Sequence, residues 1–387
     1  TVNAGLGDDF IQAAAGADVI NGGAGRDTVS YADVTGATAH GLTNVLGIAI
    51  NLSGEGVSDA TLEADTVADA AVGNDDPNNI LRAGTAQYII DTGEGAGTKS
   101  ADYVVDTLTS IEGLVGSALN DYIVLGADAV TVDAGAGDDV VFSGTGVDNI
   151  AGGAGADTFN IGGASDHAAN ETIDGGDGAD TIQFTSALGE TLVLSANVTG
   201  VETVQISDSA GTVGGTAESI DASALTAGIA LVGNDGANTL TGSAFADTFA
   251  AGEGDDRMII DDLDTSIDGG AGNDTVVINA DAAFTAAEFV NAEVASLASG
   301  VSLTLDWTEF DIGEGGEGSL ATVNGVNDGV TETLIVQGID LGDGESALDF
   351  SGGEGAVSLQ NVVLDYRGGD DVDTVTGTAA ADLLAGG

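Results

Sequence analysis

The stretch that decides the fold is Gly22-Gly23-Ala24-Gly25-Arg26-Asp27-Thr28-Val29-Ser30. It follows the pattern G-G-x-G-x-D-x-U-x, in which U is an apolar residue. The same frame steps back through Asp18 to Asp9 at nine-residue intervals. A short repeat of this period predicts a solenoid of stacked strands. The glycines supply the positive φ angles that tight turns between the strands require.

Three further blocks keep this frame. Val130 and Thr265 occupy the motif position without a carboxylate, so their coils are predicted to be unliganded, and Asn238 occupies it nine residues before the third block's first aspartate. The motif aspartates are Asp121, Asp139, Asp148, Asp157, Asp166 and Asp180 in the second block, Asp247, Asp256 and Asp274 in the third, and Asp373 and Asp382 in the fourth.

Two nonapeptides form one coil of eighteen residues, so aspartates two repeats apart are expected to stack along one edge. Asp9 and Asp27 share an edge in this prediction, as do Asp121, Asp139 and Asp157, and Asp256 and Asp274. Asp148 and Asp166 line the opposite edge. The apolar residue two positions after each aspartate ends an inward-facing strand. These residues are Ile11, Ile20, Val29, Val141, Ile150, Phe159, Ile182, Phe249 and Val276, with Ile259 included by a slip of one.

The charge of the chain is strongly one-sided, with 64 Asp and Glu against 5 Lys and Arg and a net charge of −59. Nevertheless 43% of the residues are hydrophobic, whereas acidic disordered segments contain few apolar residues. We therefore expect a folded chain whose self-repulsion is neutralised by cations from solution. Phosphate binding needs clusters of Lys and Arg, so a nucleic acid is not expected as a partner. No apolar run is long enough for membrane insertion.

The repeats resemble the calcium-binding repeats-in-toxin (RTX) family. The match is most specific at Gly22 to Ser30, Gly152 to Asn160, Gly175 to Gln183 and Gly269 to Val277. The resemblance implies an all-β fold, a parallel β-roll or β-helix solenoid with nonapeptide calcium coils and wider strand-rich insertions. In that family the motif aspartate and the glycine-turn carbonyls of adjacent coils surround Ca²⁺ with oxygen, and oxygen ligands suit Ca²⁺ on chemical grounds as well.

The resemblance implies several Ca²⁺ ions. It assigns the carboxylate ligands to Asp9, Asp18, Asp27, Asp139, Asp148, Asp157, Asp180, Asp256 and Asp274. Asp121, Asp247 and Asp373 hold the same motif position and are predicted as ligands with them. The predicted carbonyl ligands are Gly5, Gly7, Gly23, Gly25, Gly135, Gly137, Gly153, Gly155, Gly176, Gly178, Gly270 and Gly272.

The predicted domain organisation alternates two kinds of segment. Calcium β-roll blocks cover residues 1–30, 116–184, 238–278 and 367–387, and strand-rich wider coils cover 31–115, 185–237 and 279–366. The Ala-rich stretch 281–299 is compatible with a short helix. Residues 106–121 resemble elements of large RTX adhesins and surface-layer proteins of type I secretion, and related elements recur at 200–204 and 291–294.

The sequence offers little for catalysis, and we expect no enzyme. Neither H-E-x-x-H nor G-x-S-x-G occurs, and His167 is interpreted as a surface residue of a turn. The acid pairs Asp8/Asp9, Asp138/Asp139 and Asp255/Asp256 look like glycosidase dyads, but each contains a motif aspartate that calcium explains better. The alternative is a calcium module of a secreted polysaccharide-active lyase or epimerase, although few basic residues are present to stabilise a carbanion.

The expected function is structural. The chain is predicted to fold on Ca²⁺ outside a bacterial cell, at its surface or in its matrix, and to assemble into a surface layer, filament or adhesin stalk. The sequence starts and stops in mid-repeat, and joining its ends would place Asp9 fourteen residues after Asp382 (5 + 9). This motivates a tandem array or head-to-tail self-assembly, with cell-surface polysaccharide as a second possible partner.

Overall fold

The protein is represented by a computed structural model. It describes residues 1–13, 17–35, 38–39, 42–43, 45–53, 57–58, 80–81, 85–90, 105–207, 214–284, 289–306, 322–325, 332–339, 348–349, 358–360, 362–368, 375–376 and 383–385. The chain divides into two compact units, Thr1–Val213 and Gly214–Gly387. Each unit is described by itself.

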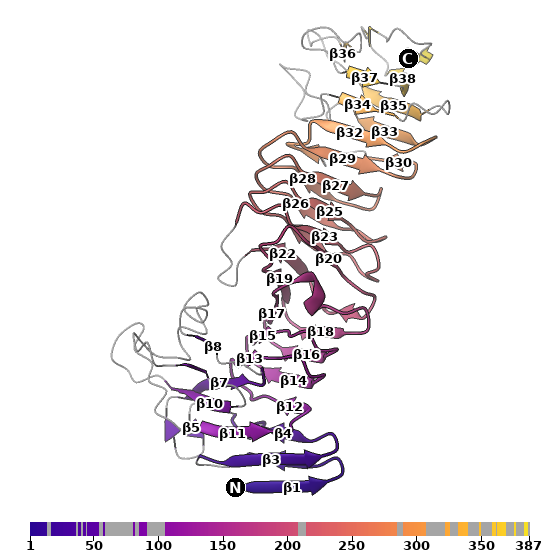
Figure 1. The fold of residues 1–387 in the computed structure, drawn as a ribbon. Coiled ribbons are helices and arrows are strands. Elements are labelled where there is room, and N and C mark those ends of the chain that lie inside the picture. The colour runs from indigo at the N-terminus through magenta and orange to yellow at the C-terminus, as the bar shows by residue number, and fades with distance from the viewer. Residues whose placement is uncertain are drawn as a thin grey trace. The chain divides into compact units, whose positions relative to one another are not determined.

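The first unit is a solenoid in which short strands stack coil upon coil and form two sheets (Figure 1). One face carries, in spatial order, β2 (Phe10–Gln12), β4 (Thr28–Ser30), β12 (Gly113–Val115), β14 (Thr131–Ala136), β16 (Asn149–Ala154), β18 (Thr172–Asp177) and β21 (Val198–Thr199). The other carries β1 (Val2–Leu6), β3 (Val19–Ala24), β11 (Val105–Thr109), β10 (Thr85–Ile90), β7 (Val45–Asn51), β13 (Tyr122–Val124), β15 (Val140–Phe142), β17 (Thr158–Ile161), β19 (Thr181–Phe184) and β22 (Thr203–Ile206).

The register confirms the eighteen-residue coil. Val2 pairs with Ile20, and Tyr122, Val140 and Thr158 pair in succession along parallel strands. Each strand is only a few residues long because the next glycine turn follows at once. The parallel arrangement therefore places residues at the same motif position directly above one another.

The wider segment of the first unit contributes strands to the same stack. Ile48 to Asn51 is extended, within β7, and β10 pairs antiparallel with both β7 and β11. Two small antiparallel pairs, β5 (Thr38–Ala39) with β6 (Leu42–Thr43) and β8 (Val57–Ser58) with β9 (Ile80–Leu81), also lie in this segment. The 3-10 helix η1 (Ala164–Asp166) and the strand β20 (Thr191–Val193) lie further along.

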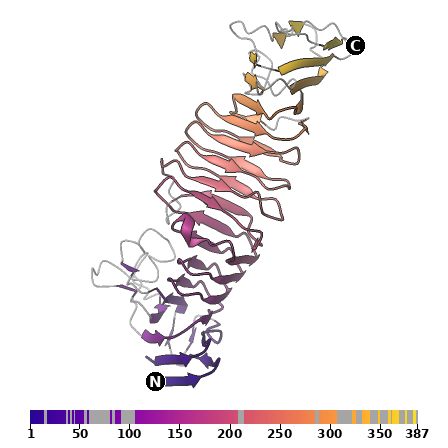
Figure 2. The same ribbon diagram turned by 45° about the vertical axis from the view of Figure 1, so that its right-hand side comes forward.

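The second unit has the same construction (Figure 2). One face carries β23 (Ser219–Asp221), β25 (Thr239–Thr241), β27 (Arg257–Ile260), β29 (Thr275–Ile278), β32 (Val294–Leu297), β34 (Thr322–Asn324) and β37 (Ser358–Gln360). The other strands are β24 (Ala230–Val232), β26 (Thr248–Ala250), β28 (Ser266–Asp268) and β31 (Phe289–Val290), then β30 (Ala282–Ala283), β33 (Ser302–Asp306), β35 (Glu332–Ile339), β38 (Val362–Gly368) and β40 (Leu383–Ala385), and the pair β36 (Leu348–Asp349) and β39 (Val375–Thr376).

The helix considered for residues 281–299 is wrong for the part of that segment that the structure describes. Its residues form β30, β31 and β32, which pair in parallel with neighbouring coils. Coil-to-coil hydrogen bonding and burial of the Phe284 and Phe289 rings, whose centroids are 4.8 Å apart, favour the extended form over alanine's helix propensity.

The core lies between the two faces and is built from the apolar residue that follows each motif aspartate by two positions. All the predicted positions are buried except Ile259. There Met258, which stands two residues after Asp256, is 0% exposed, and the slip to Ile259 was therefore unnecessary. Because the period is strict, motif aspartates that are one coil apart lie at the same corner of successive coils.

Candidate metal centres

The motif carboxylates form ladders that run from coil to coil. Oδ1 of each aspartate accepts a hydrogen bond from the backbone N–H of the residue at the same motif position one coil earlier. The N–H to Oδ1 distances are 2.9 Å for Asp9 to Asp27, 2.7 Å for Asp121 to Asp139, 2.8 Å for Asp139 to Asp157, 2.8 Å for Asp157 to Asp180, 2.7 Å for Asn238 to Asp256 and 2.8 Å for Asp256 to Asp274. The structure thus brings together the predicted stacks Asp9/Asp27, Asp121/Asp139/Asp157 and Asp256/Asp274.

The second oxygen of most of these carboxylates is buried and has no hydrogen-bond partner among the residues that the structure describes. These atoms are Oδ2 of Asp9, Asp27, Asp139, Asp148, Asp157, Asp180, Asp256 and Asp274. Burying a carboxylate oxygen without a partner is costly, and folded proteins rarely leave such atoms unsatisfied. A recurring orphan at one motif position indicates a missing partner of positive charge.

The first glycine of each complete motif lets the turn approach its aspartate closely. A Cβ placed on Gly22 would stand 2.6 Å from Oδ2 of Asp27, and one on Gly269 would stand 2.8 Å from Oδ2 of Asp274. The predicted glycine ligands all have φ between +90° and +158°, and Gly153 and Gly155 lie directly against the carbonyls of Gly135 and Gly137. Carboxylate oxygens and turn carbonyls together form a donor set that fits Ca²⁺.

Side chains alone would not complete such a site. In the described part of the chain, no three His, Cys, Asp or Glu side chains group closely enough to hold a metal ion. The aspartates are spaced one per turn, and the remaining ligands would have to be backbone carbonyls. Glycine turns, which bring carbonyls close to one another, supply those.

Burial raises the pKa of the ladder carboxyls. The pKa of Asp139 rises to about 9, because of burial and then the nearby charges of Asp121 and Asp157. Burial also raises the pKa of Asp148, Asp157, Asp256 and Asp274 to about 6 each. Without a cation Asp139 therefore favours a bound proton at neutral pH, and the other four carboxyls take up protons as the pH falls through about 6.

Asp18 lies in a different setting from the other predicted ligands. Its backbone N–H donates to Oδ1 of Asp106 at 2.9 Å, and Oδ2 of Asp106 accepts the Tyr31 hydroxyl at 2.9 Å. The carboxylate that stacks on Asp18 in the next coil is thus that of Asp106, and each of its two oxygens accepts a hydrogen bond. Asp373 lies outside the described residues.

Three glutamates occupy the motif position after the last aspartate of a ladder, and the sequence reasoning missed this role. The N–H groups of Asp27, Asp180 and Asp274 donate to carboxylate oxygens of Glu112 at 2.9 Å, Glu202 at 2.7 Å and Glu293 at 2.7 Å. The signal was present, because the adhesin-like elements noted in the sequence contain these three glutamates. Their longer side chains reach the same N–H from the wider coils.

The prediction that Asp166 stacks on Asp148 is wrong. The pairing of Asn149 with Thr172 places Glu171 at that position, because the coil is five residues longer than the standard one (23 − 18) and Asp166 lies in η1. His167 is buried rather than on the surface, with Nδ1 3.6 Å from Oε1 of Glu171.

Val130 does occupy a motif position without a carboxylate, and its N–H donates to Oδ1 of Asp148 at 2.8 Å. Thr265 stands one coil after Asp247, as predicted, since its N–H donates to the Asp247 carbonyl at 3.1 Å. The residue before Thr265, Asp264, takes the place of the missing motif carboxylate, because its Oδ1 accepts the N–H of Asp247 at 2.9 Å. Asp264 was not anticipated from the sequence.

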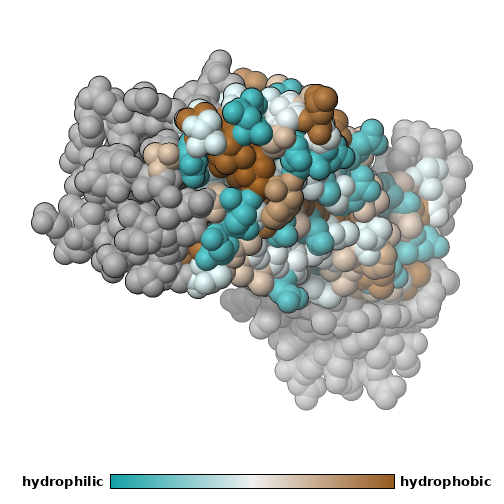
Figure 3. Space-filling model, turned by 90° about the horizontal axis from the view of Figure 1, so that it is seen from below, coloured by the Kyte–Doolittle hydropathy of each residue, from teal (hydrophilic) through white to brown (hydrophobic). Residues whose placement is uncertain are grey.

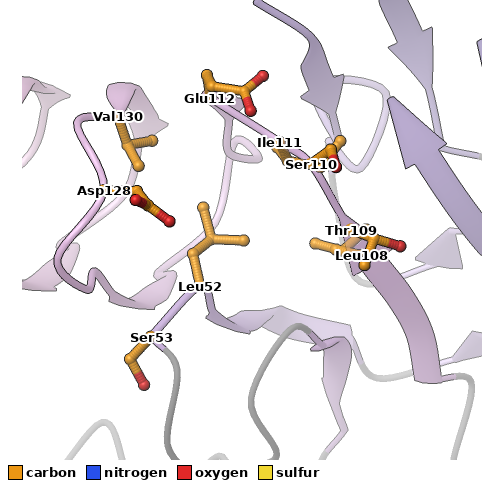
Figure 4. Close-up of a pocket in the computed structure, with 9 residues that line it drawn as sticks. All are labelled: Leu52, Ser53, Leu108, Thr109, Ser110, Ile111, Glu112, Asp128 and Val130. Atoms are coloured by element: carbon orange, nitrogen blue, oxygen red, sulfur yellow. The ribbon is translucent and has the colours of Figure 1, made fainter. Parts of the chain in front are cut away.

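The adjacent acid pairs do not converge as a catalytic dyad would. Asp138 Oδ1 accepts the N–H of Ala156 in the following coil at 2.9 Å, whereas Asp139 Oδ1 accepts from Asp121 in the preceding coil. A pocket of about 140 Å³ lies between the end of β7 and the β11–β12 connection (Figure 4). Its charged lining residues are Glu112 and Asp128, and Glu112 is already bonded to Asp27.

No helix within the described ranges is long and apolar enough to cross a bilayer.

Stacked nonapeptide coils with aspartates and glycine turns at each corner define the class of calcium-binding β-roll proteins. The family described as RTX calcium-binding nonapeptide repeat (4 copies) matches residues 1–29, 115–150, 143–168, 165–183, 232–259, 264–280 and 367–387. These segments are RTX calcium-binding repeats, and such repeats are typical of secreted proteins. No curated protein matches the chain.

Proposed function

We propose that this chain is a secreted structural protein whose β-roll closes on several Ca²⁺ ions outside a bacterial cell and then assembles into a surface layer, filament or adhesin stalk. The observation that carries the proposal is the repeated buried Oδ2 atom without a hydrogen-bond partner in the described part of both units, in turns that contain positive-φ glycines. The proposed ligands are the aspartates with such an atom and the glycine carbonyls of their turns.

Charge explains why the ion would control folding. A chain with a net charge of −59 repels itself, and the ladders concentrate carboxylates at spacings of one coil. An ion that binds only the folded form stabilises it by mass action. Low calcium inside a cell would keep the chain expanded, and millimolar calcium outside would fold it, which suits a protein exported before folding.

The proposed self-assembly would use the surface of the first described coil. Among described strands β1 pairs only with β3, and Leu6 and Phe10 are 89% and 67% exposed. Figure 3 shows apolar surface beside polar surface in the view from below. A further coil, from the same polypeptide or from a second copy, would pair with β1 and cover these side chains. Cell-surface polysaccharide is the other proposed partner.

The lyase or epimerase module is the alternative, and a calcium β-roll is compatible with it. The two proposals make different demands: a structural role needs a repeated self-contact, whereas a lyase or epimerase needs a cleft that binds sugars. Electron microscopy of the protein in calcium separates them, because ordered arrays or filaments support the first and dispersed particles with glycan-cleaving activity support the second.

The calcium step is tested by far-ultraviolet circular dichroism and sedimentation of the full chain, first in calcium and then after chelation. We expect β-structure and a compact particle with calcium, and an expanded particle after chelation. Identical spectra and sedimentation in both conditions would refute the proposed function.

A further inference from the structure

Two turns satisfy the second aspartate oxygen without any ion. In the first unit the Ser117 N–H donates to Oδ2 of Asp121 at 2.5 Å, and the Ser117 hydroxyl donates to Oδ1 at 2.7 Å. In the second unit the Ser243 N–H and hydroxyl donate to Asp247 in the same way, at 2.5 and 3.0 Å. Each serine hydroxyl also accepts the N–H of the residue two positions later, at 3.1 Å.

A third turn reaches the same result without a charge. The Asn234 N–H donates to Oδ1 of Asn238 at 2.7 Å, and Asn238 Nδ2 donates to the Glu218 carbonyl at 2.8 Å. Asn238 occupies the motif position and its N–H donates to Asp256. A neutral amide with these partners leaves no buried negative charge for a cation to offset.

The position that separates the two kinds of turn lies four residues before the motif acid. In turns with an orphan Oδ2 it is a glycine, and in all of them except the turn of Asp148 its φ is positive, for example Gly135 at +114°, Gly153 at +113° and Gly270 at +90°. Gly144, four residues before Asp148, is not among the positive-φ residues, and its backbone forms a hydrogen bond with Asp148. Ser117 and Ser243 are not among the residues with positive φ in the described ranges. The serine turn therefore has a different backbone shape, which points its own N–H at the carboxylate.

We propose that the residue four positions before the motif acid decides whether a turn takes calcium. Glycine with positive φ there gives a calcium turn, and serine or asparagine gives a turn closed by its own donors, so that Asp121 and Asp247 are structural residues and not metal ligands. This inference rests on the proposed calcium binding. In the serine turns, the seryl N–H and hydroxyl stabilise the buried carboxylate, as a bound ion would in the glycine turns.

The location of these turns gives them a further role. Asp121 begins the ladder that continues through Asp139 and Asp157, and Asn238 begins the ladder that continues through Asp256 and Asp274. If the turn at the start of a ladder is ordered without metal, its backbone is already in place when the next coil stacks on it. Calcium-driven folding in each of these ladders then starts from a prepared template.

Hydrogen exchange on the full wild-type chain tests the two kinds of turn directly. In excess chelator, amides in the serine turns at 116–122 and 242–248 should exchange at least tenfold more slowly than amides in the glycine turns at 134–140 and 152–158. Calcium should slow exchange strongly only in the glycine turns. Equal sensitivity to calcium in all four segments would overturn the inference.

A gain of binding provides the second test. The double substitution Ser117→Gly with Leu119→Gly converts residues 116–121 to the complete motif Gly-Gly-Ala-Gly-Asn-Asp, and native mass spectrometry should then count one more Ca²⁺ than in the wild type. The matched control, Ser117→Ala with Leu119→Ala, removes the hydroxyl without providing the glycine turn and should gain none.

The outcomes separate the two proposals. Wild-type protein that binds no calcium contradicts the proposed function itself. Wild-type protein that binds calcium, together with a folded Gly-Gly variant whose ion count is unchanged, contradicts only the assignment of the serine turns. The exchange experiment decides the question if the variant does not fold.

Discussion

Asp139 donates its backbone N–H to Oδ1 of Asp157 at 2.8 Å, while Oδ2 of Asp157 is buried with no hydrogen-bond partner in the described structure. One carboxylate therefore has two separate tasks. Its first oxygen ties two coils together, and its second oxygen is available to a cation. The following predictions test each task.

Replacing Asp157 by Asn keeps the oxygen that accepts the Asp139 N–H but removes the charge. A hydrogen bond or contact to a charged group contributes roughly 2 kcal/mol, so calcium affinity should fall about thirtyfold. Isothermal titration measures the change. Asp138→Asn is the matched control, because Asp138 is an exposed neighbour whose carboxylate accepts the Ala156 N–H. Equal losses in both variants would show that overall charge, not the site, sets the affinity.

The positive φ of the turn glycines can be separated from their close packing. Gly153 and Gly5 have φ of +113° and +117°, but a Cβ on Gly153 would collide with the Gly135 carbonyl, whereas a Cβ on Gly5 would have no neighbour within 4 Å. Gly5→Ala should cost only the backbone strain, about 1–2 kcal/mol. Gly153→Ala should cost clearly more, measured as the free energy of unfolding in calcium. Similar losses at the two positions would mean that close stacking adds nothing.

The glutamate that follows a ladder should stabilise it through one hydrogen bond. Glu202→Ala removes the acceptor of the Asp180 N–H and should lower the free energy of unfolding by about 1–2 kcal/mol. Glu202→Gln keeps an acceptor oxygen and should restore most of the loss. A Gln variant as unstable as the Ala variant would indicate that the charge of Glu202 matters more than its hydrogen bond.

Calcium binding should strengthen as pH rises. The folded, metal-free pKa values of Asp139, at about 9, and Asp157, at about 6, lie above the ordinary value of about 4. Protons therefore stabilise the metal-free fold most fully below the ordinary value, and that contribution is lost as pH rises through about 6 to about 9. Calcium must displace these protons, so its affinity should increase across the same range with proton release.

Titration calorimetry in buffers of different ionisation enthalpy measures that proton release. Calcium binding that is independent of pH between about 5 and 9, with no released protons, would show that the ladder carboxyls are already ionised before the metal arrives.

The nine-residue frame was enough to predict the solenoid, the stacking of Asp9 on Asp27 and the inward side chains such as Phe159. A strict period fixes which residues share a corner, and the burial of one face leaves little freedom of register. The prediction was wrong where the coil length changes, as at Asp166, because a five-residue insertion shifts the frame and brings Glu171 into the column instead. Counting along the sequence cannot detect where such a loop returns to the stack.

The local chemistry of individual turns was also beyond the sequence pattern. Asp121 and Asp157 occupy the same motif position, yet one carboxylate is satisfied by Ser117 and the other has an orphan oxygen. The role of Asp264 depends on a contact between coils that no local motif encodes, whereas the element at 200–204 carried a signal for Glu202 that was not recognised. The sequence pattern shows which aspartates stack on one another, whereas their hydrogen-bond partners show which carboxylates have an oxygen left for a cation.

The central claim is tested most directly by an atomic map of the calcium-loaded protein, with the anomalous signal of the ion to identify it. The account predicts ions about 2.3–2.6 Å from the orphan Oδ2 atoms of Asp139, Asp157, Asp256 and Asp274, with glycine carbonyls completing each shell. Glycine turns that are empty in saturating calcium would contradict it.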